Sequence, residues 1–493
     1  MTKTTLVATV MEESGVAFGT SGARGLVTAM TDRVCFTYTC AFLQHMTAIG
    51  QFAPGMAVAI AGDLRPSSPR ILWACAAAIV HCGGIVDHCG FVPSPAVAAY
   101  GFARGIPSLM VTGSHIPDDR NGIKFNRADG EVLKPDEAAI RAQGVDLPDL
   151  FDAAGMLRTA PAPTPPCDAA TPYVARYVDF FGPDALAGLK LGVYQHSAVG
   201  RDDVLEIVTA LGAQAVALAR SDTFIPVDTE AVRPVDQELA RQWAAEFDFD
   251  AILSTDGDSD RPLLADETGQ WLRGDVLGVL CAQALGITAL ATPVSSNSAL
   301  ELSGLFSQVV RTRIGSPFVI EAMNTLIALG ETACGYEANG GFILGSPVTQ
   351  EGRTLAALPT RDAVLPMLAV LAQARRSGLS VSALRATLPP RFTASDRLQN
   401  YPTAKSQALV ARLGEGEAPA VLAKVGDLFG SFAGPATLFN QVDGLRITFA
   451  SGDIIHLRPS GNAPELRVYT EGDTPERATT LLEQAMAVVV ALP

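Results

Sequence analysis

The chain has 493 residues, of which 36 are Lys or Arg and 51 are Asp or Glu, so its formal net charge at pH 7 is −15. This acidic balance argues against a nucleic-acid partner, because binding to a phosphate backbone needs a basic stripe. Apolar residues make up 48% of the chain and charged residues 18%, which excludes a disordered protein and predicts three or four globular domains.

No segment predicts export or membrane insertion. Glu12 and Glu13 interrupt the N-terminal stretch before a long apolar run develops, and the most apolar later stretch, 277–294, falls short of the ~18–20 apolar residues that span a bilayer. Eight scattered cysteines without a CxxC pair are typical of a reduced compartment. We therefore expect a soluble, cytoplasmic protein with no membrane partner, while its oligomeric state stays open.

Short apolar runs alternate with amphipathic stretches in chain order. The pattern predicts a strand, a helix and a strand at 56–62, 71–83 and 108–113. The same order returns at 190–195, 203–213 and 251–256, which indicates α/β layers.

Composition changes divide the chain further. The Pro- and Ala-rich segment 158–172 is predicted to be a linker, and alternation around Gly turns near 443–460 predicts an antiparallel hairpin. The sequence thus predicts four domains: 1–157, 173–273 and 274–388 as α/β domains, and a smaller α+β domain at 389–493.

Asp256, Asp258 and Asp260 follow an apolar run and form the most specific local motif, DGDSDR. At a spacing of two on an extended backbone, the three carboxylates would point to one side. Such hard oxygen donors at the carboxyl end of a strand suit Mg²⁺. An EF-hand is the rival interpretation, with Glu267 at loop position twelve, but Arg261 stands where the loop needs Gly. An acidic surface turn is the third.

Ser114 ends another apolar run within TGSHIP, and NGIKF, with Lys124, follows. The segment lacks the GxSxG pattern of a nucleophile elbow, and adjacent side chains on an extended chain face opposite ways, so Ser114 and His115 are not expected to pair. A serine in an ordinary turn is the alternative.

A third motif combines Arg458 and Ser460 with Gly461, Asn462 and the later Arg467. Arginine, small polar side chains and a glycine that lets backbone N–H groups approach are typical of a phosphate or carboxylate clamp. A hairpin corner with solvated arginines fits the same residues. A metal site in the His81–Cys89 segment is less favoured than a core role for its His and Cys residues.

Taken in order, these segments resemble the phosphohexomutase family of phosphomannomutases, phosphoglucomutases and phosphoglucosamine mutases. The resemblance rests on six segments that run from residue 18 to residue 464: FGTSGARG, TGSHIP, NGIKF, DGDSDR, YEANGG and RPSGNAP. It implies three related α/β domains with mixed sheets and a smaller α+β domain around a central active-site cleft.

The resemblance also implies roles for particular residues. Ser114 would carry a phosphoryl group and, with Asp256, Asp258 and Asp260, hold Mg²⁺. Further implied roles are catalytic for Lys124, Arg24, His115 and Arg261, sugar-binding for Glu337 and Asn339, and phosphate-binding for Arg458, Ser460, Gly461, Asn462 and Arg467.

Three loops depart from the usual family patterns TASHNP, GExSGH and RPSGTEP. Gly113 and Ile116 replace Ala and Asn, Asn339 and Gly341 replace Ser and His, and 462–463 read Asn-Ala instead of Thr-Glu. These departures bear on the choice of sugar more than on the reaction.

The expected activity is interconversion of a hexose 1-phosphate and a hexose 6-phosphate through a phosphoserine and a bisphosphate intermediate. Mannose phosphate is the first choice and glucose phosphate the second, with Mg²⁺ as cofactor and a hexose 1,6-bisphosphate as activator. Alternatives are a phosphoglucosamine mutase or phosphopentomutase of the same family, a Mg²⁺-dependent sugar phosphatase, and a non-catalytic sugar-phosphate sensor.

Overall fold

The computed structural model describes residues 3–19, 22–159, 165–460 and 464–492. The chain forms two compact units: the first comprises Met1–Ala289 and Gly315–Arg385, and the second comprises Leu290–Ile314 and Ala386–Pro493. Among the described residues, none of the helices combines the length and apolar character that a bilayer-spanning segment requires.

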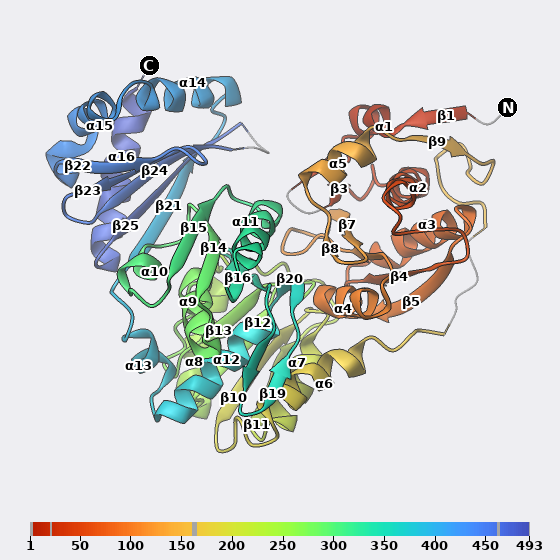
Figure 1. Cartoon of the computed structure of the whole chain (residues 1–493), viewed down its shortest axis with the longest axis horizontal. Coiled ribbons are helices and arrows are strands. Elements are labelled where there is room, and N and C mark those ends of the chain that lie inside the picture. The colour runs from red at the N-terminus through yellow and green to blue at the C-terminus, as the bar shows by residue number, and fades with distance from the viewer. Residues whose placement is uncertain (1–2, 20–21, 160–164, 461–463, 493) are drawn as a thin grey trace. The chain divides into compact units, whose positions relative to one another are not determined.

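The first sheet of the first unit mixes parallel and antiparallel strands in the order β2-β3-β7-β6-β4-β5, and β8 pairs with β7. Several of its strands, among them β4, β5 and β7, are labelled in Figure 1. β4 runs parallel to β5 and β6, whereas β7 is antiparallel to β3 and β6. The strands are β2 (Ala17–Phe18), β3 (Ala23–Leu26), β4 (Ala57–Gly62), β5 (Ile85–Phe91), β6 (Ser108–Val111), β7 (Arg120–Arg127) and β8 (Gly130–Glu131).

The helices around this sheet complete one apolar core. The hydroxyl of Thr31 caps the first of the long helices, and Phe36, Phe42, Ile60 and Phe125 meet in the core. A small antiparallel pair joins the N-terminus to residues 144–147. These elements are β1 (Lys3–Leu6), α1 (Val7–Ser14), α2 (Asp32–Ala48), α3 (Ser68–His81), α4 (Ser94–Arg104), α5 (Lys134–Arg141) and β9 (Gly144–Leu147).

The second sheet of this unit has the order β11-β10-β12-β13. β10 is parallel to β11 and β12, and β13 returns antiparallel to β12. The buried run AILST forms β12, so the aspartate motif follows directly at the carboxyl end of a central strand. The elements are α6 (Ala170–Phe181), β10 (Lys190–His196), α7 (Arg201–Ala210), β11 (Gln214–Arg220), α8 (Pro234–Phe247), β12 (Ala251–Thr255) and β13 (Pro262–Ala265).

A third group of elements in the first unit contains the antiparallel strands β16, β17 and β20. The apolar helices α9 and α12 contact each other and are buried along most of their length. The elements are α9 (Gly274–Leu285), α11 (Ser316–Ala328), β16 (Ala333–Tyr336), β17 (Phe342–Leu344), β18 (Val348–Gln350), β19 (Arg353–Leu355), β20 (Leu358–Asp362), α12 (Val364–Ser377) and α13 (Val381–Arg385).

The second unit is dominated by an antiparallel sheet in the order β21-β25-β24-β23-β22. β23 and β24 form the hairpin predicted near 443–460. The elements are β14 (Ala289–Pro293), α10 (Ala299–Leu302), β15 (Gln308–Thr312), β21 (Phe392–Leu398), α14 (Thr403–Gly414), α15 (Ala418–Ala433), β22 (Ala436–Asn440), β23 (Leu445–Phe449), β24 (Ile454–Pro459), β25 (Leu466–Gly472) and α16 (Pro475–Ala491). The predicted fold class, α/β layers followed by an α+β region, is confirmed.

Candidate active site

Ser114 lies in the loop that leaves β6 and is almost fully buried. Its backbone has φ 56°, in the left-handed region, and its N–H donates to Thr112 Oγ1 at 2.7 Å. The hydroxyl donates to Asp256 Oδ2 at 2.6 Å, so the loop aims Ser114 at the aspartate motif. The expectation that Ser114 and His115 face apart is wrong: the left-handed turn breaks the alternation, and Ser114 Oγ lies 3.3 Å from His115 Nδ1.

The guanidinium of Arg65 holds this loop from inside. It donates to four backbone carbonyls, those of Ser114, Ile116, Pro117 and Arg120, and pairs with Asp63 at 3.0 Å. Gly113 makes room for it, because a Cβ at that position would stand 2.6 Å from Arg65 Cζ. Sequence reasoning gave Arg65 no role, since nothing local shows that its side chain reaches the segment 114–120.

Asp256, Asp258 and Asp260 lie in a buried turn after β12, and one oxygen from each lies within 4.8 Å of the others. The predicted extended spacing does not bring them together. Instead the backbone turns at Ser259, with φ 58°, and the N–H groups of Asp260 and Arg261 both donate to Asp256 Oδ1.

The EF-hand interpretation is wrong, because strands β12 and β13 flank the turn and the Glu267 carboxylate accepts from Ser380 and Ser382 instead. Among the residues the structure describes, the three aspartates are the only group of three or more His, Cys, Asp or Glu residues that could hold a metal ion. The His81–Cys89 segment therefore forms no such group.

Both the geometry of the aspartate turn and the state of its carboxylate oxygens suit a divalent cation. Asp258 Oδ1 and Asp260 Oδ1 are buried and have no hydrogen-bond partner among the residues that the structure describes. Burial, followed by the charges of Asp258 and Asp260, raises the pKa of Asp256 well above its usual value. Three buried carboxylates repel one another when all are ionised. A bound Mg²⁺ would offset this repulsion and favour the ionised form of Asp256.

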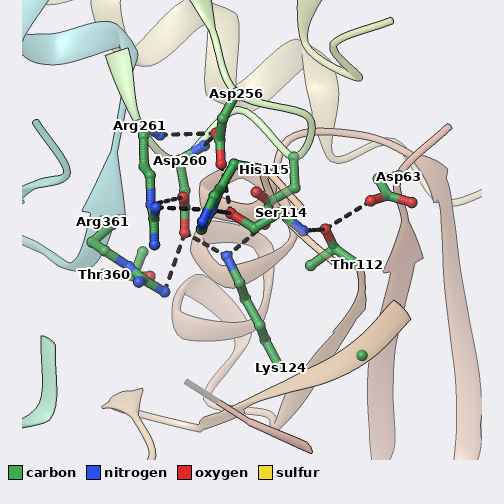
Figure 2. Close-up of polar contacts among 12 residues, drawn as sticks. Asp63, Thr112, Ser114, His115, Lys124, Asp256, Asp260, Arg261, Thr360 and Arg361 are labelled. Atoms are coloured by element: carbon green, nitrogen blue, oxygen red, sulfur yellow. Dashed lines mark hydrogen bonds and ion pairs between the residues drawn. The ribbon is translucent and has the colours of Figure 1, made fainter. Parts of the chain in front are cut away.

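Several cations surround the aspartates. Lys124 Nζ points in from β7 toward Asp260 (Figure 2). It lies 2.5 Å from both Asp258 Oδ2 and Asp260 Oδ2. Its nearest charged partners are thus carboxylates. Burial and, second, the positive charge of Arg261 lower the pKa of Arg24 to about 10. The guanidiniums of Arg24 and Arg261 therefore interact electrostatically.

His115 is neutral in this surrounding. Burial and then the charge of Arg261 lower its pKa to about 3. Arg261 Nη1 lies 2.9 Å from His115 Nδ1 and can only donate, so Nδ1 is the unprotonated nitrogen and Nε2 carries the proton.

Glu337 and Asn339 lie in the loop between β16 and β17 and are both buried. Asn339 Oδ1 accepts from the N–H of Gly341 at 3.0 Å, which shapes the loop. Within the described part of the chain, Glu337 Oε2 has no hydrogen-bond partner, and Arg361 Nη1 lies 3.7 Å from it. Arg361, in β20, also lies 3.2 Å from Asp260 and 3.5 Å from Glu131, and sequence reasoning assigned a role to neither Arg361 nor Glu131.

The phosphate-clamp motif lies in the second unit. Arg458 donates through Nε to Asp443 Oδ2 at 2.9 Å, and Ser460 is buried. Gly461 and Asn462 fall outside the described residues. Arg467 stands directly opposite Arg458 on β25, and Arg397 on β21 stands opposite Arg467, so three arginines form one row across the sheet. Arg397 was missed because only strand pairing brings it into register.

In the first unit, the structure therefore brings together Ser114, His115, Lys124, the three aspartates, Arg261 and Glu337. In the second unit it brings together Arg458, Ser460 and Arg467. A buried hydroxyl beside a cation site, with fixed positive charges around it, is an arrangement that can carry and transfer a phosphoryl group.

Comparisons with known proteins agree with this chemistry. The family models described as phosphoglucomutase/phosphomannomutase α/β/α domain I, α/β/α domain III and C-terminal domain match residues 15–144, 273–392 and 407–488. A protein named phosphomannomutase from Sinorhizobium fredii is 46% identical over 477 residues, which cover 96% of this chain and 99% of the relative. Another phosphomannomutase, from Salmonella muenchen, is 45% identical over 479 residues, which cover 97% and 96%.

A solved structure gives the same picture of the fold. The crystal structure of a phosphoglucomutase/phosphomannomutase family protein from Burkholderia thailandensis superposes with a TM-score of 0.72 at 20% identity, covering 96% of this chain and 97% of that chain. The resemblance drawn from the six motifs is thereby confirmed: the chain belongs to the phosphoglucomutase/phosphomannomutase family, the phosphohexomutases, and is an intramolecular phosphotransferase of that type.

Proposed function

We propose that the protein interconverts mannose 1-phosphate and mannose 6-phosphate, with glucose phosphates as the second substrate pair, through phospho-Ser114 and a hexose 1,6-bisphosphate. The observation that carries the proposal is the 2.6 Å hydrogen bond from Ser114 Oγ to Asp256 within the aspartate turn. This bond supports the proposal because the hydroxyl that would carry the phosphoryl group lies beside the carboxylates that fit Mg²⁺. The choice of mannose is supported by the names of the relatives at 46% and 45% identity.

The transfer itself exchanges one O–P bond for another. The bond between Ser114 Oγ and phosphorus breaks while a bond forms from the free sugar hydroxyl to the same phosphorus. The hydroxyl proton passes to a neighbouring carboxylate, and the Lys124 ammonium, which can only donate, gives a proton to the departing Ser114 Oγ. Arg261 and Arg24 offset the negative charge on the transferring phosphoryl oxygens. When bound, Mg²⁺ would supply further neutralisation at Asp256, Asp258 and Asp260.

The rest of the substrate is held by residues away from the phosphorus. Glu337 accepts hydrogen bonds from sugar hydroxyls, and its unpartnered Oε2 is available for them. Arg458, Ser460 and Arg467 hold the phosphate that does not react. Because the bisphosphate must reverse before the second transfer, the same clamp serves the phosphate on carbon 1 and on carbon 6.

The test is a panel of 1-phosphates of mannose, glucose, glucosamine and ribose, assayed with Mg²⁺ and a trace of the matching bisphosphate. We expect the highest kcat/KM for mannose 1-phosphate, and intact mass should show one added phosphoryl group on Ser114. Release of inorganic phosphate without isomer formation would show a phosphatase and overturn the proposal. Highest efficiency on the glucosamine or ribose compound would overturn the choice of sugar.

Ser114→Ala should abolish turnover and labelling while leaving the unfolding midpoint close to that of the wild type. The matched control is Ser108→Ala, because Ser108 is also buried, begins the strand β6 that leads to the Ser114 loop, and accepts one side-chain hydrogen bond, from Asn126. The control should keep turnover. An active Ser114→Ala variant would refute the phosphoserine.

A further inference from the structure

Arg361 is a buried guanidinium shared by carboxylates from three separate segments of the first unit. It is 3% exposed. Its Nη2 lies 3.2 Å from Asp260, in the aspartate turn, and its Nη1 lies 3.7 Å from Glu337, in the loop after β16. Its Nε lies 3.5 Å from Glu131, which follows β7. Each nitrogen thus faces a different segment (Figure 2 shows its approach to Asp260).

Two features fix the guanidinium in this position. Glu131 is itself held, because the hydroxyls of Ser316 and Thr360 and the N–H of Arg361 all donate to it. The stem of Arg361 passes over Gly341, where a Cβ would stand 2.9 Å from Arg361 Cδ. The glycine that replaces the histidine of the usual family pattern therefore leaves space that Arg361 occupies.

The charges explain what a fixed cation does here. Arginine keeps its charge in proteins, and the carboxylates of Asp260, Glu131 and Glu337 all lie within 4 Å of this guanidinium and favour its charge. The single positive charge of Arg361 attracts both Asp260 and Glu337. A divalent ion bound at Asp260 would compete with Arg361 for that carboxylate. As Asp260 is taken by the ion, more of the guanidinium's attraction remains for Glu337.

We propose that Arg361 is a positioning residue that links the cation site to the sugar loop, so that binding of the divalent ion strengthens the hold on Glu337. The assignment of Glu337 to the sugar rests on the proposed function, whereas the link between the two carboxylates does not. The prediction that follows is unusual for a structural arginine: its removal should tighten binding of the divalent ion, since a competing positive charge disappears.

The experiment is calorimetric titration of Mn²⁺ into the full-length protein, a readout that needs no sugar turnover. The dissociation constant of Arg361→Met should be roughly five- to fiftyfold lower than that of the wild type. Arg361→Lys, which keeps the charge, should stay within about twofold of the wild type. Arg70→Met is the matched control, because Arg70 makes an ion pair with Asp32 elsewhere in the unit, and it should leave the dissociation constant unchanged.

A double-mutant cycle tests the link itself. In the wild-type background, Glu337→Gln should weaken Mn²⁺ binding, because Arg361 then loses one of its carboxylate partners and its charge competes more strongly for Asp260. In the Arg361→Met background, the same substitution should lose at least half of its effect on a logarithmic scale. Unchanged or weaker Mn²⁺ binding in Arg361→Met would overturn the proposal, and so would an equal effect of Glu337→Gln in both backgrounds.

Turnover assays test the proposed function, and Mn²⁺ titrations test the link through Arg361. If the wild type converts none of the sugar phosphates, the proposed function fails, while the titrations still decide whether Arg361 links the two carboxylates. If Arg361→Met does not fold, Arg361→Gln carries the same test, because it removes the charge and leaves a polar group for Glu131.

Discussion

Arg65 holds the loop that carries Ser114 from inside, and replacing Arg65 tests that role directly. In Arg65→Met, four backbone carbonyls lose a charged donor and the fully buried Asp63 loses its counter-ion. Each bond from a charged donor contributes about 1.5–3 kcal/mol, but the loop can shift after the change. The cost of breaking one buried ion pair, about 3–5 kcal/mol, is therefore the better measure of the lost unfolding free energy.

Turnover should fall for a separate reason. The Ser114 carbonyl accepts from Arg65 at 2.7 Å, so without Arg65 the loop that aims Ser114 is free to move, and a misplacement of about 1 Å costs on the order of 100-fold in rate. The double variant Asp63→Asn/Arg65→Met removes the orphaned charge. It should recover at least half of the lost stability and little of the lost turnover.

The assays are urea unfolding and kcat for both variants, with Arg70→Met as a control for loss of an arginine ion pair. Burial already raises the pKa of Asp63, against the opposing charge of Arg65. In Arg65→Met the folded-state pKa rises further above the unfolded value, so protonation favours the folded state and the stability deficit should shrink from pH 8 to pH 5. Wild-type turnover in Arg65→Met, or turnover restored together with stability in the double variant, would refute the clamp.

Three further predictions test other parts of the site and fold. Asp258→Asn should lower turnover by orders of magnitude, with partial recovery in excess Mg²⁺, and full activity in EDTA would contradict the metal role. Arg458→Ala should lower kcat/KM by roughly 10- to 150-fold from the 1-phosphate and the 6-phosphate alike, and a loss from one isomer only would contradict a shared clamp. Burial, then Arg446, lowers the pKa of His456 to about 4, so the unfolded state takes up a proton first as pH falls below ~6.5. Wild type should therefore lose about 2 kcal/mol more than His456→Gln between pH 6.5 and pH 5 in urea titrations, and parallel curves would contradict this assignment.

The sequence was informative where function depends on local patterns. The apolar runs before Ser114 and Asp256 predicted strands, and both strands form: β6 ends at Val111, three residues before Ser114, and β12 ends at Thr255, directly before Asp256. The order of six motifs predicted the family, which no single motif could.

The remainder depends on contacts between distant segments. Arg65 acts on a loop some fifty positions away, and Arg361 meets carboxylates from three regions, so no local spacing announces either residue. The left-handed backbone of Ser114 and Ser259 also escaped prediction, because serine ordinarily avoids that region and only the surrounding hydrogen bonds make it favourable.

The contact between Gly341 and the Arg361 stem constrains how this protein can change. A residue with a side chain at 341 cannot be introduced while Arg361 lies there, and loss of Arg361 alone leaves Glu131, Glu337 and Asp260 without their common counter-ion. Either substitution alone is therefore harmful, and the two positions should vary together among relatives. Grafting the family's usual histidine into this loop accordingly requires a simultaneous change at 361, so the sugar loop and β20 must be redesigned as one unit.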